Sequence, residues 1–368
     1  MRLVVGVNHA APFHVGGSEK VVQQITESMT SDFDMDCHVI TRFANKSVTH
    51  NGVHVEPMKD DSQQFINQVN ALKPDHFLVY SDSFHHWPTV VRQAEAFKCS
   101  KSVALVGMNH MRSREELFRL FRRKHEQFTV ITHSDNYLDF KQCNSFDIPV
   151  RVIPNAIDMS EFEDHGFSFR EKYKIPSSKK IILCVSNFFP GKGQEHLLHI
   201  LKKLKNKGHD FVAVFICTPV NFRPAEVMRQ RFSQQIKRAG FDYKILVSIP
   251  REDTTQAFLE ADVFAFPSQI EVAPLVMLES MAAGLPWVAM NVGNVPTLDG
   301  GFMVQGGKKV NGKLTFDSSV YDEFTNALDS MLSDTAAREK KGKEGLDRIL
   351  AEFDWEKVKK QYHEVFTA

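Results

Sequence analysis

Short apolar runs recur along the whole chain and alternate with longer polar or amphipathic stretches. They lie at Leu3–Val7, Cys37–Thr41, His76–Tyr80, Val103–Gly107 and Phe128–Thr132, and again at Ile181–Val185, Phe211–Ile216, Lys244–Val247, Val263–Phe266 and Trp287–Met290. Runs this short and continuous are typical of strands buried on both faces of a parallel sheet, with helices between them. The pattern predicts an α/β fold with two doubly wound, Rossmann-like domains.

The two series of runs also predict where the domains divide. A chain of 368 residues is long for one core and suits two. The stretch Val150–Asp158 closes the first series, and a polar segment, Glu161–Lys180, leads to the second. We therefore place the first domain at residues 1–157 and the second at residues 158–351.

Composition narrows the class of protein. With 42% hydrophobic and 24% charged residues, the chain resembles a water-soluble globular protein. The 45 basic and 45 acidic residues balance, so no global field favours nucleic acid or an anionic membrane. Five dispersed cysteines without paired spacing indicate a reducing compartment, and no apolar run approaches the ~18 residues of a membrane span. We expect a cytoplasmic protein, with peripheral contact at the inner membrane surface left open.

Polar side chains follow several of the predicted strands. In open α/β sheets, ligands bind outside the carboxyl ends of the strands. In the first domain these ends carry the polar side chains His9, Asp82, His85 and His110, which are candidates for ligand contact. Between the first strand and its helix, the pair Gly16-Gly17 lets the backbone approach a ligand closely.

The stretch Phe266–Pro286 carries the most chemistry. Pro274 suits the start of a helix, and Gly284 marks its end. Backbone N–H groups near Leu275 and Val276, with the helix dipole, form a site for phosphate. Glu271 before the helix and Glu279 on its second turn can each accept hydrogen bonds from a sugar diol. The arrangement fits a nucleotide-sugar, whereas two solvated glutamates are the simpler structural interpretation.

One further feature of the second domain and two of the first need an interpretation. Lys192 lies in a loop between strand and helix, from which it can reach a diphosphate. Asp32–Asp36 contains Asp-x-Asp, a motif that binds a metal ion where it follows a strand. Here it precedes a strand, so we interpret its aspartates as turn residues and predict no metal site. The basic segment 112–127, which begins at Arg112, is either an ordinary amphipathic surface helix or a helix that faces a membrane or polyanion.

The full context of the two glutamates, Pro-Ser-x-x-Glu-x-x-Pro-Leu-Val-x-Leu-Glu-x-Met-Ala-x-Gly-x-Pro, closely resembles the signature of retaining glycosyltransferases of family 4, which have the GT-B fold. The Gly-Gly-x-Glu at Gly16, the Val-Ile-Pro-Asn-Ala-Ile-Asp up to Asp158 and the Lys-Gly at Lys192 are similar to other motifs of that family. Asn187 departs from the pattern, because the family has an arginine there. Gly293–Thr297 also departs, because the second glycine and the glutamate of that loop are changed.

The resemblance implies a reaction and roles for residues. A sugar would move from a nucleoside diphosphate (UDP or GDP) to a hydroxyl of a glycan or lipid-linked acceptor, with retention and without metal or other cofactor, as in polysaccharide biosynthesis. Lys192, Glu271 and His110 would be catalytic. The donor would contact Gly16, Gly17, Asn187, Lys192, Arg251, Glu271, Ala273, Leu275, Val276 and Glu279, and the acceptor side would include His9, Asp82, His85 and Arg112.

The resemblance also implies that a terminal helix, 352–368, packs back on the first domain. Two other functions stay open. One is a transferase acting on bases in DNA, which the balanced charge disfavours without excluding it. The other is a catalytically weak nucleotide-sugar-binding protein, which the loss of the arginine at Asn187 suggests. The oligomeric state is not indicated.

Overall fold

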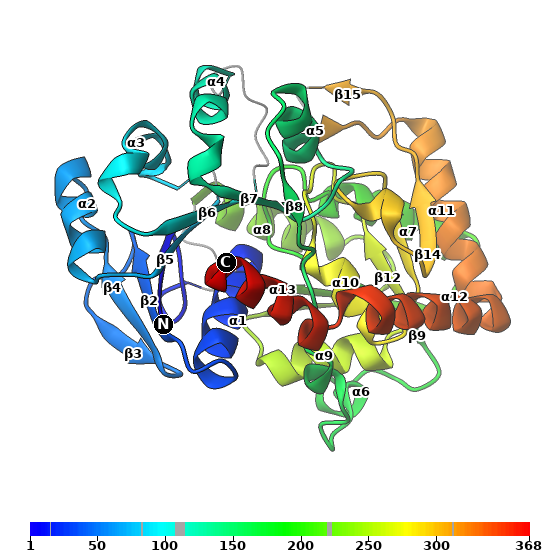
Figure 1. Ribbon diagram of the computed structural model, residues 1–368. Coiled ribbons are helices and arrows are strands. Elements are labelled where there is room, and N and C mark those ends of the chain that lie inside the picture. Colours follow the sequence, from blue (N-terminus) through cyan, green and yellow to red (C-terminus); the bar gives the residue numbers. More distant parts are fainter. Residues whose placement is uncertain (15, 82–83, 107–114, 219–222, 311–312) are drawn as a thin grey trace. The chain divides into compact units, whose positions relative to one another are not determined.

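The computed structural model describes residues 1–14, 16–81, 84–106, 115–218, 223–310 and 313–368 and divides into two compact units (Figure 1). Unit 1 comprises Met1–Asn155 and Glu356–Ala368, and unit 2 comprises Ala156–Trp355. The chain therefore leaves unit 1 after Asn155 and returns to it for its last helix.

Unit 1 is built on an eight-stranded sheet with the order β3-β4-β2-β1-β5-β6-β7-β8. All pairs are parallel except β3 with β4. Its elements are β1 (Arg2–Val7), α1 (Gly17–Ser31), β2 (Asp36–Thr41), β3 (Val48–His50), β4 (Val53–Pro57), α2 (Ser62–Ala71), β5 (His76–Tyr80), α3 (Trp87–Arg92), η1 (Ala94–Ala96), β6 (Ser100–Leu105), α4 (Glu115–Arg123), η3 (His125–Gln127), β7 (Thr129–Thr132), α5 (Leu138–Ser145), β8 (Arg151–Val152) and α13 (Trp355–Thr367).

Unit 2 is built on a six-stranded, fully parallel sheet with the order β11-β10-β9-β12-β13-β14, and it carries a separate two-stranded hairpin, β15-β16. Its elements are η4 (Met159–Phe162), α6 (Phe169–Lys172), β9 (Lys180–Val185), α7 (Gln194–Asn206), β10 (Phe211–Cys217), α8 (Arg223–Ile236), β11 (Asp242–Val247), α9 (Arg251–Glu260), β12 (Val263–Phe266), α10 (Leu275–Ala282), β13 (Trp287–Met290), η5 (Val295–Thr297), β14 (Gly301–Val304), β15 (Lys309–Val310), β16 (Lys313–Leu314), α11 (Ser318–Ser333), α12 (Thr335–Arg348) and the π-helical turn η6 (Ile349–Phe353).

The continuous apolar runs become the central strands because both faces of each sheet are covered. All four side chains of β12 are fully buried, and those of β13 nearly so. In unit 1, Phe65, Ile66 and Val69 of α2 lie in the same core cluster as residues of β1, β2 and β5. The α/β prediction of two Rossmann-like sheets is confirmed.

The local differences from the predictions have identifiable causes. The hairpin β3-β4 turns at Asn51-Gly52, whose φ angles are 47° and 81°, and Asn-Gly is a strong signal for such a turn that the search for apolar runs passed over. Helix α1 has Gly16 at its N-cap, and Gly16 has no side chain that could cap the helix. Helix α10 begins at Leu275, with Pro274 as its N-cap.

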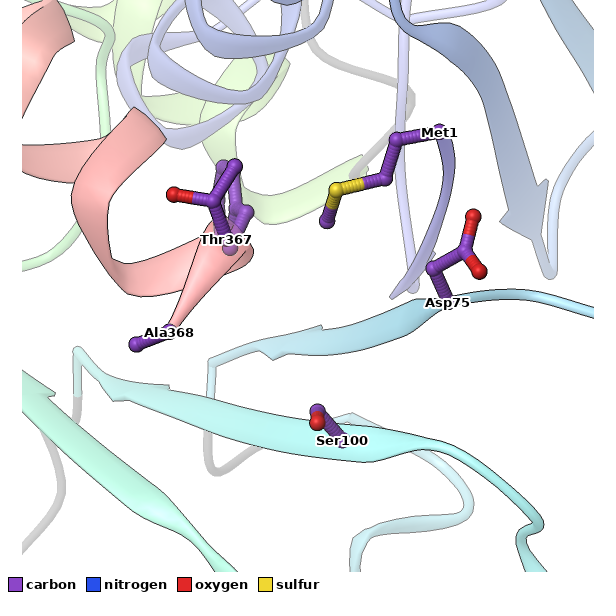
Figure 2. Close-up of a pocket in the computed structure, with 6 residues that line it drawn as sticks. Met1, Asp75, Ser100, Thr367 and Ala368 are labelled. Carbon is purple, nitrogen blue, oxygen red and sulfur yellow. The ribbon is translucent and has the colours of Figure 1, made fainter.

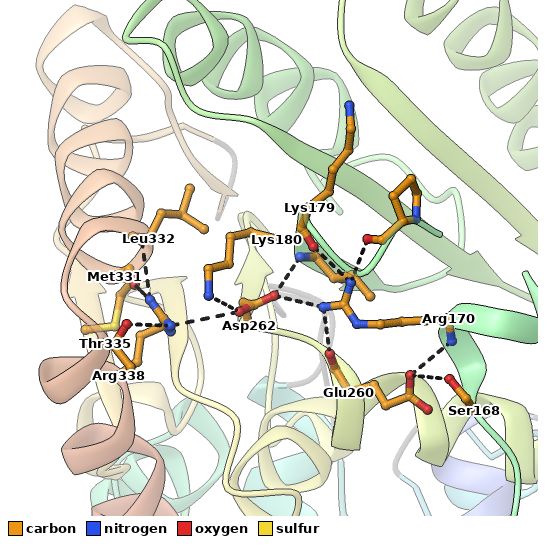
Figure 3. A network of polar contacts seen from close by, with 12 residues as sticks. Ser168, Arg170, Lys179, Lys180, Glu260, Asp262, Met331, Leu332, Thr335 and Arg338 are labelled. Atoms are coloured by element: carbon orange, nitrogen blue, oxygen red, sulfur yellow. Dashed lines mark hydrogen bonds and ion pairs between the residues drawn. The ribbon is translucent and has the colours of Figure 1, made fainter. Parts of the chain in front are cut away.

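A network of charged side chains fixes the segment between Ala156 and β9 to the rest of unit 2 (Figure 3). Glu260 accepts hydrogen bonds from the backbone N–H groups of Phe169 and Arg170, at 2.6 and 3.0 Å. Asp262 accepts from the N–H of Ile181 at 2.8 Å and from the guanidinium of Arg170 at 3.2 Å. The polar segment that the sequence predicts as a connection between the domains is thus an integral part of unit 2.

Helix α13 packs on unit 1. Lys359 Nζ lies 2.6 Å from Asp32 Oδ2, just beyond the end of α1. The ring of His363 stacks on Phe33 with the centroids 4.1 Å apart, and Phe366 lies beside His76. An ion pair and two ring contacts therefore bind the last helix to the unit formed by the first residues of the chain.

Candidate functional site

Adjacent strands bring the two most informative loops of unit 2 together. Strand β9 pairs with β12 in parallel, so the loop before α7 and the loop before α10 leave the same edge of the sheet. Lys192 from the first loop and Glu271 from the second form an ion pair of 2.5 Å between Nζ and Oε1. The sequence predicted both residues as site residues without predicting their contact.

Glu271 is held in a defined position. The residue is 6% exposed, and its Oε1 also accepts a hydrogen bond of 2.7 Å from the hydroxyl of Ser268. A buried carboxylate is stable only when charge and hydrogen bonds compensate the loss of water. Because both contacts are made to Oε1, Oε2 is the oxygen that can accept from a ligand.

Close backbone approach holds these two loops together. Gly193, the N-cap of α7, has a φ of 78°, and a Cβ on it would lie 2.2 Å from the carbonyl oxygen of Pro267. The N–H of Gln269 donates to the carbonyl of Gly191 at 2.7 Å. Only glycine fits at position 193, so the Lys-Gly pair has a steric reason as well as a chemical one.

Asn187 and Gln194 organise the end of β9. Asn187 Oδ1 accepts a hydrogen bond of 2.9 Å from the N–H of Thr218, which follows β10. Buried Gln194 donates from Nε2 to the hydroxyl of Ser186 at 2.8 Å and to the carbonyl of Asn187 at 3.0 Å. The side-chain oxygen of Asn187 thus joins two strand ends, and this side chain supplies no positive charge.

Glu279 is the second buried carboxylate of the site and is paired with Arg251. The residue is 4% exposed and lies on α10, and its Oε1 is 2.7 Å from Nη2 of Arg251 at the start of α9. The same guanidinium contacts Glu161 at 2.6 Å. Burial lowers the pKa of Arg251, but Glu279 and Glu161 oppose that effect and leave it above its ordinary value. Arg251 therefore remains charged between two carboxylates.

The start of α10 lies between these two ion pairs along the chain. Ala273 and Pro274 precede Leu275 and Val276, and the N-cap residue Pro274 makes no side-chain hydrogen bond to the helix. The first N–H groups of a helix have no acceptor within it. The carbonyl of Val272 accepts from the N–H of Asn294 at 2.9 Å, and a Cβ on Gly293 would lie 2.3 Å from that carbonyl. The loop after β13 therefore supports the loop that contains Glu271.

The acceptor-side candidates of unit 1 fall into two groups. Asp82, His110 and Arg112 lie outside the described residues. His85 is exposed, and its N–H donates to Asn8 Oδ1 at 2.9 Å. His9 stacks on Phe43 with the ring centroids 4.4 Å apart. Burial, then the neighbouring His14, lowers the pKa of His9 against the opposing effect of Glu19.

The two glycines before α1 lie beside a carboxylate. Gly16 is the N-cap, and a Cβ on it would lie 2.4 Å from Oε2 of Glu19, whereas Gly17 has open space. The same glutamate lies 3.6 Å from His14 and 3.9 Å from His9. His9, His14, Glu19 and Phe43 thus gather near the carboxyl end of β1.

The described part of the basic segment is packed on its apolar side. Phe121 of α4 is fully buried in the core of unit 1, and Leu120 packs against that core. These two side chains behave as those of an amphipathic surface helix. Among the described residues, no helix is both long and apolar enough to cross a membrane.

One hollow in unit 1 lies away from the carboxyl ends of the strands (Figure 2). It has a volume of about 300 Å³ and is lined by Met1, Asp75, Ser100, Phe366, Thr367 and Ala368. Met1, Asp75 and Ser100 precede or begin β1, β5 and β6. Because ligands of such sheets bind at the opposite ends, we assign it no part in the site.

Comparison with solved structures defines the fold class. The sucrose-phosphate synthase of Thermosynechococcus elongatus matches with a TM-score of 0.80 and 16% identity over 100% of this chain and 98% of that one. Anabaena HepE in complex with UDP-glucose matches with a TM-score of 0.77 and 17% identity over 100% and 99%. The chain has the GT-B fold, as the sequence resemblance implied.

Sequence comparison finds a matching family model and curated relatives. Residues 167–348 match the family described as Glycosyl transferases group 1. An uncharacterized glycosyltransferase of Methanocaldococcus jannaschii is 26% identical over 66% of this chain and 60% of its own length. A GDP-mannose-dependent alpha-(1-6)-phosphatidylinositol monomannoside mannosyltransferase of Mycolicibacterium smegmatis is 25% identical over 61% and 59%. The chain spans less than two thirds of the length of these relatives.

Three residues near the site were not among the sequence candidates. Ser268 stands in the Pro-Ser of the motif and was a detectable signal. Glu161 and Gln194 had no detectable signal in the sequence. The contact of Glu161 depends on where the segment after Ala156 folds, and that of Gln194 depends on how α7 begins. Each lies in unit 2 within hydrogen-bonding distance of a candidate residue or its backbone.

Proposed function

We propose that the protein is a retaining glycosyltransferase that moves a sugar from a nucleoside-diphosphate sugar to a hydroxyl group. The observation that carries the proposal is the grouping, in unit 2, of a cationic Lys192 on buried Glu271 with the uncapped start of α10 and buried Glu279. A diphosphate needs cations and N–H donors, and sugars need fixed acceptors. The group contains both kinds of partner.

In this mechanism the residues act through charge and position. Lys192 and the N–H groups of Leu275 and Val276 stabilise the negative charge that grows on the leaving diphosphate. Glu271 uses Oε2 to accept from hydroxyls of the donor sugar. Arg251 holds Glu279 in place, and the carboxylate of Glu279 accepts from the ribose. The leaving phosphate oxygen takes the proton of the acceptor hydroxyl while the new glycosidic bond forms on the same face.

The matched family and two relatives support the donor class. The family model covers the segment that contains both glutamates and Lys192. A protein of the same fold binds UDP-glucose, and a curated relative uses GDP-mannose. We propose a UDP- or GDP-linked sugar as donor, a glycan or lipid-linked acceptor, and chemistry in which Lys192 and the helix amides take the place of a metal ion.

The test begins with a thermal-shift panel of nucleotide-sugars. A bound donor stabilises the fold by ~2.7 kcal/mol at a hundredfold excess over its dissociation constant. With the donor so identified, we measure hydrolysis and transfer for the wild type, Lys192→Ala and Glu195→Gln. Glu195 is an exposed carboxylate at the start of α7 and serves as the control.

We expect turnover to fall sharply in Lys192→Ala and to stay unchanged in Glu195→Gln. The anomeric configuration of the product, read by NMR, must equal that of the donor. Donor binding without any turnover would leave only the binding-protein alternative, which the uncharged Asn187 favours. Inversion at the anomeric carbon, or normal turnover in Lys192→Ala, would refute the mechanism.

A further inference from the structure

Two histidines and two carboxylates gather on one face of the sheet in unit 1, at the edge formed by β2 and β4. These strands are parallel neighbours in which His38 pairs with His54 and Ile40 with Glu56. Side chains two residues apart on a strand lie on the same face. Asp36 and His38 of β2 therefore share a face with His54 and Glu56 of β4.

The ligand atoms of three of these residues converge. One atom each from Asp36, His38 and His54 lies within 4.8 Å of the other two. His38 Nε2 is 3.1 Å from Asp36 Oδ1, and the rings of His38 and His54 have their centroids 4.8 Å apart. Around a tetrahedral Zn²⁺, ligand atoms at about 2.0–2.1 Å from the metal are roughly 3.3 Å from each other. Exposed His54 can rotate to close the remaining gap.

The surrounding residues fix the two ligands of β2. Asp36 Oδ2 accepts from Arg2 Nε at 2.7 Å, so Oδ1 is the oxygen directed to His38. Glu56 Oε1 lies 4.0 Å from the other ring nitrogen of His38, and Glu56 is itself held by Gln68 of α2 at 3.1 Å. A carboxylate near the second nitrogen of a histidine ligand is the usual outer partner in metal sites.

We propose that Asp36, His38 and His54 form a binding site for a divalent transition-metal ion of the Zn²⁺ class. Imidazole nitrogen with one carboxylate oxygen suits Zn²⁺, Co²⁺ or Ni²⁺ better than Mg²⁺ or Ca²⁺, which prefer oxygen ligands. The formal charges of Asp36, Glu56 and Arg2 sum to −1. The two carboxylates therefore outweigh the guanidinium of Arg2, and the net charge attracts a divalent cation.

The site lies in the amino-terminal half of β2. Thr41, at the carboxyl end of β2, is three residues beyond His38 and therefore roughly 10 Å further along the strand, at about 3.3 Å per residue. Ligands of parallel sheets bind at the carboxyl ends, so we assign the metal a stabilising role, joining β2 to β4, and no part in sugar transfer. Sequence analysis does not predict this site, because the three ligands lack a recognised spacing and Asp36 belongs to an aspartate run that is typical of a turn.

The test uses the full chain without a histidine tag, treated with chelator and desalted. Co²⁺ is titrated while the visible d–d bands are followed, and Zn²⁺ is then used to displace it. The first variant is His54→Ala, because His54 is exposed and its removal leaves the core intact. The matched control is His50→Ala, a histidine of β3 on the opposite face from Thr49, the strand partner of His54.

We expect the wild type and His50→Ala to bind one Co²⁺ with the same affinity. His54→Ala should bind about tenfold more weakly or worse, a loss at least as large as that from removing an outer partner of a metal ligand. The Tm of the wild type should rise with Zn²⁺ and not with Mg²⁺. Absence of saturable Co²⁺ binding, or equal binding by His54→Ala, would overturn the proposal whether or not sugar transfer is found.

Discussion

The most constrained residue of the candidate site is Glu271. Its carboxylate is buried, and a lysine and a serine hydroxyl meet the same oxygen. A charge in such a position is strongly destabilising if its partners are removed. Two separate motifs make Glu271 and Lys192 candidate site residues. Their pairing depends on the adjacency of β9 and β12 and on the backbone contact at Gly193, which neither motif contains.

Two buried serines of the stretch Phe266–Pro286 differ in what they hold, and their variants can be compared directly. Ser268 donates to Glu271, whereas Ser280 donates to the carbonyl of Leu285 at 2.7 Å. A hydrogen bond to a charged group is worth roughly 1.5–3 kcal/mol. We expect Ser268→Ala to lower kcat/KM for the donor roughly tenfold or more. Ser280→Ala should lower only the thermal stability, and equal kinetic effects of both variants would contradict the assignment.

Gly193 permits a second test at a single residue. Gly193 and Gly208 both have positive φ angles, 78° and 92°, but a Cβ at 193 meets a backbone oxygen and one at 208 meets nothing within 4 Å. The left-handed conformation costs a non-glycine residue roughly 1–2 kcal/mol in both places. We expect Gly193→Ala to lower the free energy of unfolding clearly more than Gly208→Ala, measured by urea denaturation. Equal losses would show that the contact with Pro267 is unimportant.

At the scale of elements, continuous buried strands were predicted well and half-exposed ones were not. Strands β12 and β13 have the bounds that their apolar runs predict, because burial on both faces leaves an unbroken signal. Strands β3 and β4 are short and carry polar side chains on one face, so they leave no such run. The hairpin β15-β16 has two residues in each strand and is too short to be recognised by pattern.

The attachment of α6 to α9 through Glu260 makes stability depend on pH. Burial raises the pKa of Glu260, but hydrogen bonds from Arg170, Gln256 and Phe169 outweigh it, so the folded-state pKa lies below the ordinary value. The unfolded chain therefore binds a proton more readily, and the contribution to stability is full above the unfolded pKa of about 4.3 and is lost as pH falls through the folded value.

We therefore expect Glu260→Gln to be less stable than the wild type at pH 7 by roughly 1–3 kcal/mol. The difference should shrink as the pH falls below about 4.3. Urea denaturation across this range measures both. A difference that does not change with pH would show that the carboxylate charge is not what holds α6 to α9.

At the scale of the whole molecule, the chain begins and ends in the same unit. Helix α13 belongs to unit 1, although in the sequence it follows all the residues of unit 2. The two series of apolar runs predict two domains, and the resemblance to the glycosyltransferase family predicts that the terminal helix packs on the first. They did not predict the particular contacts, because the ion pair between Lys359 and Asp32 joins residues 327 positions apart.

Two neighbouring lysines test how α13 is held. Lys359 is paired with Asp32 and Glu356, whereas Lys360 is exposed. We expect Lys359→Met to increase amide hydrogen exchange in α13 and to cost roughly 1 kcal/mol or more, because it leaves the partly exposed Asp32 without its cation. Lys360→Met should change neither. Equal protection of α13 in both variants would show that the ring contacts alone hold the helix.

The proposed function requires unit 2 to bind a nucleoside-diphosphate sugar between the Lys192–Glu271 ion pair and the carboxylate of Glu279. Isothermal titration of the donor selected by the thermal-shift panel tests it most directly, with wild type, Glu279→Ala and Glu195→Gln compared. We expect saturable donor binding that is unchanged in Glu195→Gln and at least about tenfold weaker in Glu279→Ala, because a charged hydrogen bond is lost. Equal affinity in Glu279→Ala, or no binding of any nucleotide-sugar by the wild type, would contradict it.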